Sequence, residues 1–136
     1  MDDCIFCKIV TGEIPAHKVY ENGEVLAFLD IKPKNHGHTL VIPKKHYRNI
    51  LDIPEETWLS MMKTVHLLAP IIKKSMNADG INLSMNNEPA AYQDVFHAHM
   101  HIIPRIHGDP YRPWAGTAHY KEGEAEKAAE KIRSAL

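Results

Sequence analysis

Two short stretches rich in strand-forming residues, at 16–20 and 25–30, are the first regular feature of the chain. Asn22-Gly23 stands between them, and an Asn-Gly pair flanked by such stretches is a strong signal of a tight hairpin turn. A third strand is expected at 39–42, where the following proline ends it because proline has no N–H for a sheet ladder. The first third of the chain therefore predicts three strands, two of them joined as a hairpin.

A helical periodicity begins after Asp52. We expect Asp52 to cap this helix and Pro54 to lead into it, with Glu55 and Glu56 at its positive end. Pro70 removes a backbone donor, so it should kink the helix or divide it in two. The apolar residues that recur at helical spacing and predict one buried face are Trp58, Met61, Met62, Val65, Leu68, Ala69 and Ile72.

The second half of the chain returns to strands and closes with a helix. Strands are expected at 81–85 and 95–104, a loop at 105–120, and a helix at 122–135, which is rich in Ala, Glu and Lys. Strands grouped around one long helix predict an α+β fold built on an antiparallel sheet. Residues 1–136 contain no obvious repeat or linker, so we expect one domain.

Composition and charge narrow the classes of function. Hydrophobic residues make up 44% of the chain and charged residues 24%, as in ordinary globular proteins. A formal net charge of −1 gives no general attraction to nucleic acid or to an anionic membrane, so we expect neither as a partner. No apolar run approaches the roughly 20 residues of a membrane span. Acidic residues follow Met1 where a signal peptide would carry basic ones, which favours a cytoplasmic location.

Histidine is unusually abundant, with 10 among 136 residues, and three of them alternate as His97, His99 and His101. On a regular strand these side chains share one face at steps of roughly 6.6 Å, while Ala98 and Met100 face the core. Such a row fits a solvated polar face, a zinc site of the His-x-His type, or nucleophilic catalysis in which a neutral imidazole attacks phosphorus. The pattern alone does not separate these three interpretations.

The only two cysteines stand close together, as Cys4 and Cys7. In a cytosolic chain a C-x-x-C pair indicates a metal or redox site more than a structural disulfide. Two buried free thiols are the alternative.

Taken together, the motifs resemble the histidine triad (HIT) family, whose signature alternates histidine with apolar residues and ends in two apolar residues. The run 97–103 matches that signature at every position. Further similar segments are 4–9, 12–15, 27–31, 37–46, 79–82 and 86–87. The resemblance covers roughly residues 4–107 and is closest to a bacterial, Hint-like branch with a cysteine pair, whose Pro104-Arg105 ending is shared with dinucleoside-polyphosphate hydrolases. It implies a HIT-like fold with a five-stranded antiparallel sheet, one long helix and a C-terminal helix, paired into a homodimer.

This resemblance implies that His99 attacks the α-phosphate of a purine nucleotide and carries the nucleotidyl group until water removes it. The other ring nitrogen of His99 should donate to a backbone carbonyl, which leaves the attacking lone pair free. His101 would reach the leaving atom and the phosphate oxygens, and His38 would bind phosphate from another strand. Gln93 would orient the leaving group or the attacking water. His36 matches no motif, so we expect it to face solvent.

A nucleotide cleft is implied in the same way. Asp30 would hold the ribose hydroxyls, a role suited to a carboxylate that accepts several hydrogen bonds. Asn86 and the backbone N–H of Asp94 would lie near the phosphates. The residues that match the base cleft are Phe6, Ile9, Ile14, Phe28, Leu29, Ile31 and Leu40. Apolar residues at such spacing are equally consistent with plain core.

The loop before the triad departs from the family pattern. Glu88, Ala91 and Tyr92 stand where relatives carry glycines, and Asp94 stands where many carry Ser or Thr. Glycine lets backbone amides approach a phosphate closely, so Tyr92 is expected to narrow the site. Asp94 adds negative charge unless its side chain turns away. The departure bears on substrate preference more than on reaction class.

Members of the family with the cysteine pair carry a zinc site, and here the matching positions are Cys4, Cys7, His46 and His97. A Cys₂His₂ set is a closed, structural zinc site, which would fasten the N-terminal segment beside the catalytic residues. A regular strand would point His97 and His99 the same way, so we expect a local twist to separate their duties.

The sequence therefore predicts a HIT-family hydrolase with structural Zn²⁺. It would act on AMP- or GMP-containing phosphoramidates or dinucleoside polyphosphates and release a nucleoside monophosphate. One alternative is a nucleotide-binding interaction module whose altered loop has removed most of its catalysis. Another is a metallohydrolase whose triad itself binds catalytic zinc.

Overall fold

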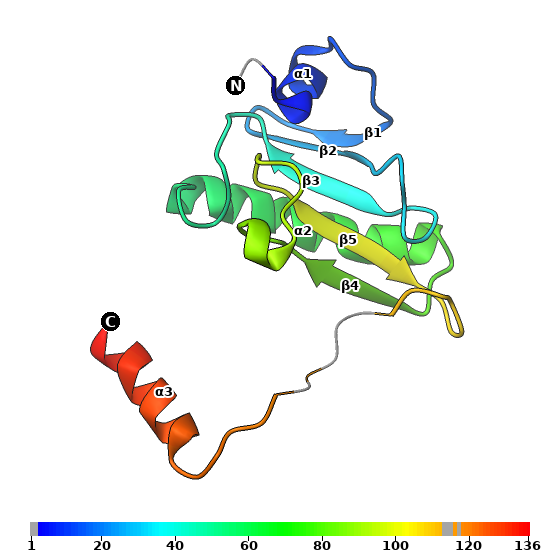
Figure 1. Cartoon of the computed structure of the whole chain (residues 1–136). Helices are drawn as coiled ribbons and strands as arrows, with labels where there is room; N and C mark the ends of the chain where they lie inside the picture. Colours follow the sequence, from blue (N-terminus) through cyan, green and yellow to red (C-terminus); the bar gives the residue numbers. More distant parts are fainter. Residues whose placement is uncertain (1–2, 113–115, 117) are drawn as a thin grey trace.

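The computed structural model describes residues 3–112, 116 and 118–136 (Figure 1). Its elements in chain order are α1 (Ile5–Thr11), β1 (Lys18–Glu21), β2 (Val25–Leu29), β3 (Thr39–Pro43), α2 (Glu55–Ser75), β4 (Gly80–Ser84), the 3-10 turn η1 (Pro89–Ala91), β5 (Met100–Arg105) and α3 (Glu124–Ser134). The predicted α+β class is confirmed. Residues 113–115 and 117 of the loop predicted at 105–120 lie outside the described residues.

One five-stranded antiparallel sheet, in the order β1-β2-β3-β5-β4, forms the centre of the fold. The side chain of Asn22 closes the β1–β2 hairpin by accepting from the backbone N–H groups of Glu24 and Val25, each at 2.9 Å. β3 pairs with β5, and this register sets Leu40 opposite His101. The middle of the sheet therefore carries the last histidine of the triad.

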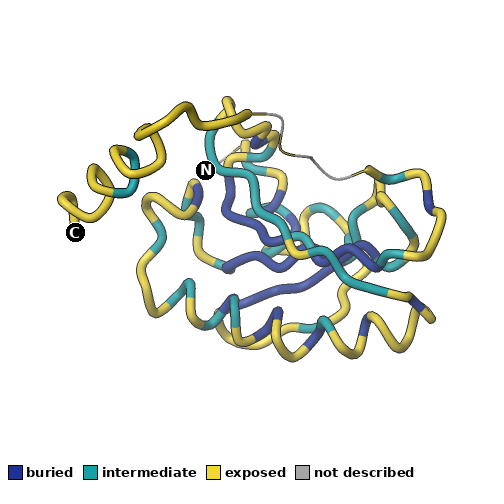
Figure 2. The backbone as a smooth tube through the Cα atoms, turned by 90° about the horizontal axis from the view of Figure 1, so that it is seen from below, coloured by how far each residue is buried: buried dark blue, intermediate teal, exposed yellow. Residues whose placement is uncertain are grey.

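Alternate residues of the central strands face opposite sides of the sheet. Val41 and Met100 belong to the core that packs against α2, whereas Leu40 and Ile42 belong to the core that includes Phe6 of α1. Figure 2 shows these strands as the most deeply buried part of the chain. Because residues paired across two strands share a face, His101 lies on the α1 side with Leu40.

β5 begins at Met100, so the prediction of a strand from residue 95 is wrong. His97 and His99 precede the strand, and the N–H of Ala98 donates to the carbonyl of Tyr47 at 2.7 Å instead of entering the β5 ladder. In this irregular segment the side chains of His97 and His99 do not have to share a face. The predicted twist within the strand is therefore not needed, because His97 and His99 lie in an irregular segment before β5.

The long helix α2 continues through Pro70, so it is not divided in two. Pro70 is exposed, and water can satisfy the carbonyl that its missing N–H leaves unpaired. The predicted cap is also wrong, because the N-cap is Pro54. Asp52 instead accepts from the N–H groups of Arg48 and Asn49, at 3.0 and 2.9 Å, and closes the turn before the helix.

α1 was not predicted from the sequence. The thiol of Cys4 accepts from the N–H of Cys7 at 3.4 Å at its start, and Gly12 ends it with a φ of 85°, a conformation that favours glycine. The predicted C-terminal helix is present as α3, which stands apart from the sheet (Figure 1). Within the described part of the chain, no helix has both the length and the apolar character that crossing a membrane requires.

Candidate active site and metal centre

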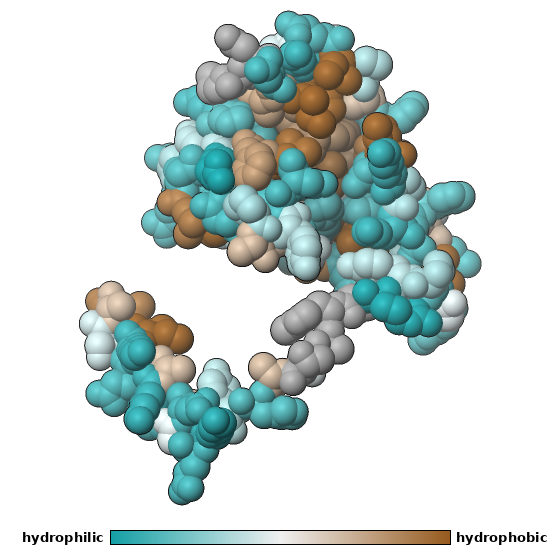
Figure 3. Space-filling view, in the orientation of Figure 1, coloured by the Kyte–Doolittle hydropathy of each residue, from teal (hydrophilic) through white to brown (hydrophobic). Residues whose placement is uncertain are grey.

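A cleft of about 360 Å³ opens on the α1 side of the sheet. Phe6, Phe28 and Leu40 are buried and form its floor, whereas Ile31 lies at the rim with 84% of its surface exposed. Figure 3 shows apolar atoms gathered around and below α1 on this face. The lining includes every apolar residue that the sequence assigned to a base cleft: Phe6, Ile9, Ile14, Phe28, Leu29, Ile31 and Leu40. Such a cleft fits a flat apolar ring system.

Sequence reasoning missed four further lining residues, which are Ile5, Pro15, Ala16 and Val95. Each of them lies within two residues of a predicted site residue in the chain. α1 and the bend after it bring in Ile5, Pro15 and Ala16, and the segment before the triad brings in Val95. The polar end of the same cleft is formed by Asp30, Asp94, His99 and His101. The structure thus brings the predicted apolar and polar groups to one hollow.

The ring of His99 is held in one tautomer. Its Nδ1 lies 2.7 Å from the carbonyl oxygen of His97, and a carbonyl only accepts, so Nδ1 carries the proton. The expected hydrogen bond to a backbone carbonyl is therefore confirmed. Phe6 packs edge-on against the buried ring, with the two centroids 5.2 Å apart. The lone pair of Nε2 is left free, and Oδ1 of the Asp94 carboxylate lies 3.9 Å from Nε2.

His38 and His101 form a hydrogen-bonded pair whose tautomers follow from a third group. The N–H of Lys34 donates to Nδ1 of His38 at 3.0 Å, so a neutral His38 carries its proton on Nε2. This Nε2 donates to Nδ1 of His101 at 2.8 Å, which leaves the proton of His101 on Nε2. Burial lowers the pKa of both rings, that of His101 to about 4, so both are neutral near pH 7. His101 thus presents an N–H donor.

This pairing changes the expected part of His38. The residue is only 2% exposed, and its ring acts on the cleft through His101 rather than from the cleft wall. Asp30 lies 3.8 Å from Nε2 of His38 and accepts from the N–H of Lys32 at 2.9 Å. His36 is exposed, as predicted.

Asp30, His38 and His101 also have potential ligand atoms within 4.8 Å of one another. A cation there would have to break the 2.8 Å hydrogen bond between the two rings, since that bond uses one nitrogen of each. The geometry therefore favours a hydrogen-bonded pair over a metal at this place.

Gln93 and Asn86 hold the loop before the triad. The amide of Gln93 donates to the carbonyls of Arg48 and Val95, at 2.7 and 3.1 Å. Its oxygen accepts from Asn49 and from the N–H of Glu88, at 3.0 and 2.8 Å. Since these bonds use the full capacity of a side-chain amide, Gln93 faces the loop and not the cleft.

The buried Asn49 belongs to the same network. No sequence motif marked it, because a single asparagine in a loop carries no pattern. Asn86 donates to the carbonyl of Tyr92 at 3.3 Å. The contact of Asn86 lies within the loop that precedes the triad, whereas Asn49 joins this loop to the segment before α2.

Glu88 and Tyr92 keep the backbone shape that glycine adopts easily. Their φ angles are 77° and 63°, and such positive values cost a non-glycine residue on the order of 1–3 kcal/mol. The ring of Tyr92 is 85% exposed, so it turns to solvent and does not narrow the site as predicted. Glu88 and Tyr92, two of the three positions where glycine was expected, therefore have positive φ angles in spite of their larger side chains.

The second cluster joins α1 to the start of the triad. Cys4, Cys7, His46 and His97 have potential ligand atoms within 4.8 Å of one another. Sγ–Nδ1 distances are 3.4 Å for Cys4–His97, 3.4 Å for Cys7–His46 and 3.6 Å for Cys7–His97. Zn–S and Zn–N bonds at tetrahedral angles place S and N about 3.6 Å apart. The four residues therefore fit a tetrahedral zinc ion.

The surroundings of this cluster also suit a metal. Nε2 of the fully buried His97 donates to the carbonyl of Pro43 at 2.8 Å, which directs the lone pair of Nδ1 toward the thiols. Burial lowers the pKa of His97 to about 4, while burial and Cys4 raise the pKa of the Cys7 thiol to about 11. A bound cation would stabilise the thiolate and so offset the unfavourable burial of its charge.

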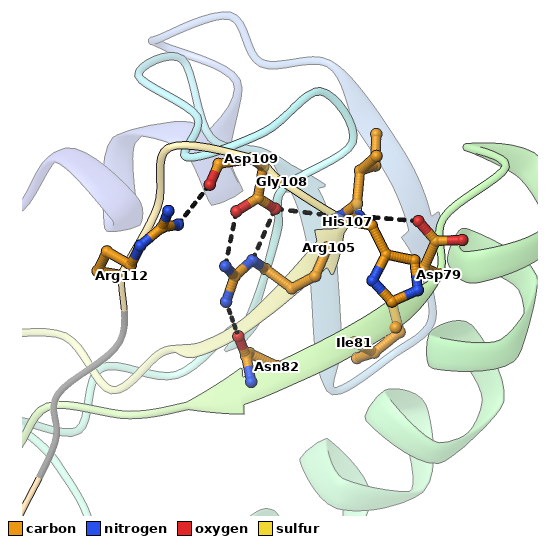
Figure 4. Close-up of a pocket in the computed structure, with 10 residues that line it drawn as sticks. Asp79, Ile81, Asn82, Arg105, His107, Gly108, Asp109 and Arg112 are labelled. Atoms are coloured by element: carbon orange, nitrogen blue, oxygen red, sulfur yellow. Dashed lines mark hydrogen bonds and ion pairs between the residues drawn. The ribbon is translucent and has the colours of Figure 1, made fainter.

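A larger hollow, of about 520 Å³, lies at the far end of β5 (Figure 4). The Arg105 guanidinium in it donates to both carboxylate oxygens of Asp109, at 2.9 and 2.6 Å, and to Asn82 at 2.6 Å. Arg105 holds the pKa of Asp109 well below its usual range. Asn35 also donates to Asp109, at 2.8 Å. The hydrogen-bonding groups in this hollow are paired with one another, so their role is to hold the segment after β5 in place. We therefore place the chemistry in the cleft on the α1 side.

Comparison with known proteins gives a consistent result. The family model described as HIT domain matches residues 11–108. An adenosine 5′-monophosphoramidase of Saccharomyces cerevisiae is 44% identical over 102 residues, which are 75% of this chain and 62% of that protein. An adenylylsulfatase of Arabidopsis thaliana is 44% identical over 108 residues, which are 79% of this chain and 55% of that protein.

Solved structures share the fold. A member of the HIT family from Bacillus subtilis superposes with a TM-score of 0.91 at 40% identity, covering 98% of this chain and 97% of that one. A Zn-bound histidine triad family protein from Mycobacterium smegmatis gives a TM-score of 0.76 at 36% identity, covering 99% of each chain.

Proposed function

The chain belongs to the HIT-domain family, and on that premise we propose that it hydrolyses nucleotides at the α-phosphate through a covalent nucleotidyl-His99. The observation that carries the proposal is the fixed tautomer of His99, whose Nδ1–H is held by the carbonyl of His97 at 2.7 Å. A neutral imidazole with a free lone pair is a nucleophile for phosphorus, and it stands at the polar end of an apolar cleft.

In the first step Nε2 of His99 forms a bond to the α-phosphorus while the bond from phosphorus to the leaving group breaks. An amine leaving group takes a proton from solvent as it departs. The Nε2–H of His101 donates to the phosphate oxygens, which stabilises the charge that develops in the transition state. In the second step water attacks phosphorus, the P–Nε2 bond breaks, and a nucleoside monophosphate and a proton are released.

The substrates that we propose are AMP- or GMP-containing phosphoramidates or dinucleoside polyphosphates. The apolar cleft would hold the purine, Asp30 the ribose hydroxyls, and the N–H of Asp94 the phosphate. We propose Gln93 and Asn86 as residues that position the loop rather than as direct partners of the nucleotide, because their amides are bonded to the loop backbone and, for Gln93, also to the carbonyl of Arg48. The relatives named as a phosphoramidase and an adenylylsulfatase support cleavage of adenylyl compounds.

We also propose that Cys4, Cys7, His46 and His97 hold a structural zinc ion. When bound, zinc would link α1 to the segment before β5. Four protein ligands would fill its tetrahedral coordination, so no position would be left for substrate. The Zn-bound relative supports this assignment. A thiolate site is compatible with the reducing cytoplasm, where we propose the protein acts.

A homodimer of single-domain chains is the proposed assembly. β4 is an edge strand and exposes 52% of Leu83, and α2 exposes apolar side chains as well: Leu59, Leu67 and Ile71. Unpaired strand edges and apolar patches are surfaces that a second copy can cover. Sedimentation velocity tests this assembly, and a monomer at micromolar concentration would contradict it.

One observation favours a second candidate, a nucleotide-binding module with weak or no catalysis. Asp94 places a carboxylate oxygen 3.9 Å from the nucleophilic nitrogen, near the position of an anionic substrate. Steady-state release of AMP from an adenosine phosphoramidate and from diadenosine tetraphosphate separates the two candidates. Turnover of either compound supports the hydrolase, whereas AMP binding without turnover of both supports the module.

A further inference from the structure

We infer that Asp94 is a specificity-determining residue that selects the leaving group by charge, favouring cationic amines over anionic groups. The inference rests on the proposed hydrolase and names the class of leaving group that its site prefers. The Asp94 carboxylate lies 3.9 Å from the attacking nitrogen, and its position, orientation and charged surroundings support the inference.

The position of Asp94 is at the boundary of two hollows. It lines the apolar cleft together with His99, and it lines a neighbouring hollow of about 400 Å³ that includes Asp3 and Phe96 and also borders Cys4 and His46 of the proposed metal site. Ile5 and Val95 also line both. A nucleotidyl group in the cleft therefore has its α-phosphate beside Asp94, and the adjoining hollow offers room for the group that leaves.

The orientation of Asp94 is fixed while its charge stays in solvent. Its Oδ1 accepts from the N–H of Val95 at 2.9 Å and lies 3.9 Å from Nε2 of His99. The side chain is 84% exposed. The carboxylate therefore stays near the reacting atoms. Because it is exposed, its charge acts on the substrate through a medium with a dielectric constant close to that of water.

The charges around Asp94 do not cancel it. Among the described residues, no lysine or arginine lines either hollow. The nearby Arg48 is paired with Glu88 at 2.9 Å and stacks on Phe96, 4.5 Å from the ring centroid. The imidazole of His101 is neutral near pH 7 because burial lowers its pKa to about 4. The leaving side of the site thus has an acidic balance.

This balance acts on the bond that breaks. When the P–N bond of a phosphoramidate breaks, the nitrogen takes a proton from solvent, and a positive charge elsewhere on that amine is attracted by Asp94. When the P–O bond of a polyphosphate or an adenylyl sulfate breaks, the leaving group keeps the electron pair as an anion, which Asp94 repels. For charges about 5 Å apart in water-like surroundings, the effect on rate is about fourfold per unit charge.

Three substrates of similar size test the inference: the adenosine 5′-phosphoramidates of ethylenediamine, propylamine and β-alanine, whose leaving groups are cationic, neutral and anionic. We expect kcat/KM of the full-length protein to fall in that order. In Asp94→Asn, which keeps an oxygen for the N–H of Val95, the ratio of cationic to anionic substrate should fall about tenfold. Glu56→Gln removes the same charge from exposed α2 on the opposite side of the sheet, and it should keep the wild-type ratio.

Each remaining outcome contradicts a defined part of the account. An unchanged ratio in Asp94→Asn overturns the selectivity and leaves the hydrolase standing. A wild-type protein that cleaves none of the three compounds overturns the proposed function together with the inference. If Asp94→Asn does not fold, the wild-type ratio still decides: it should shrink as salt rises from about 0.02 to about 0.5 M, because exposed charges are screened. A ratio that is independent of salt contradicts the inference.

Discussion

The carbonyl oxygen of His97 lies 2.7 Å from Nδ1 of His99, and this contact joins the two candidate sites. The ring of His97 belongs to the Cys4–Cys7–His46 cluster, while its backbone fixes the tautomer of the proposed nucleophile. His97 thus connects the proposed metal site with the proposed nucleophile. A disturbance of the cluster should shift the orientation of His99 as well as the stability of the fold.

Replacing Cys7 by Ser should remove bound zinc. The variant would lose one of two thiolates, and because metal affinity contributes directly to folding stability, its Tm should fall by about 10 °C. Turnover should decrease as well, since the carbonyl of His97 would be less firmly placed. Elemental analysis and thermal unfolding measure these effects.

The matched control for Cys7→Ser is His36→Ala, because His36 is exposed and lies outside both clusters. The control should keep one zinc per chain and the wild-type Tm. Wild-type protein without stoichiometric zinc, or a Cys7→Ser variant that retains it, would contradict the proposed metal site.

Asp30→Asn should weaken recognition of the ribose. The amide keeps an oxygen for the N–H of Lys32 but loses the charge and one acceptor that we assign to the hydroxyls. We expect KM for an adenosine phosphoramidate to rise about tenfold, as for the loss of a hydrogen bond to a charged group. The 2′-deoxy substrate should be much less affected, and an equal loss for both substrates would exclude the ribose assignment.

The buried imidazole pair makes stability depend on pH. Burial lowers the folded-state pKa of His101 to about 4, below the ordinary 6.5, so between these values the unfolded chain binds more protons. Stability should therefore fall as pH drops below about 6.5 and continue to fall toward pH 4, with a contribution of about 1–2 kcal/mol at pH 5 from this group. Urea unfolding at pH 7.5 and pH 5 gives the difference.

In His101→Gln this part of the pH dependence should disappear, and the difference between the two pH values should be smaller than in the wild type. Both proteins are to be compared at equal metal content, so that the cluster contributes equally. A variant whose stability depends on pH as steeply as the wild type would show that His101 does not carry the effect.

Much of this arrangement was predictable from the sequence. Asn22-Gly23 specified the hairpin, and helical spacing specified the buried face of α2 from Met61 to Ile72. The apolar residues assigned to a base cleft do line one cleft, because alternation along β2 and β3 fixes which side chains share a face.

The features that could not be predicted from the sequence depend on contacts between distant segments. The pairing of His38 with His101 requires the antiparallel register of β3 and β5, and a local pattern does not contain it. α1 has a short, seven-residue span whose start is capped by the thiol of Cys4, a cap that sequence rules do not mark. Gln93 matched a motif, but the buried Asn49 that binds its side chain decides the direction of that amide.

The central claim is that His99 carries the nucleotidyl group. Rapid acid quench during turnover of an adenosine phosphoramidate, followed by mass spectrometry of peptides, tests it most directly. We predict a peptide that contains His99 with one added AMP moiety, and no such adduct and no turnover in His99→Ala, which should still bind AMP. Wild-type turnover by His99→Ala, or an adduct on another residue, would contradict the account.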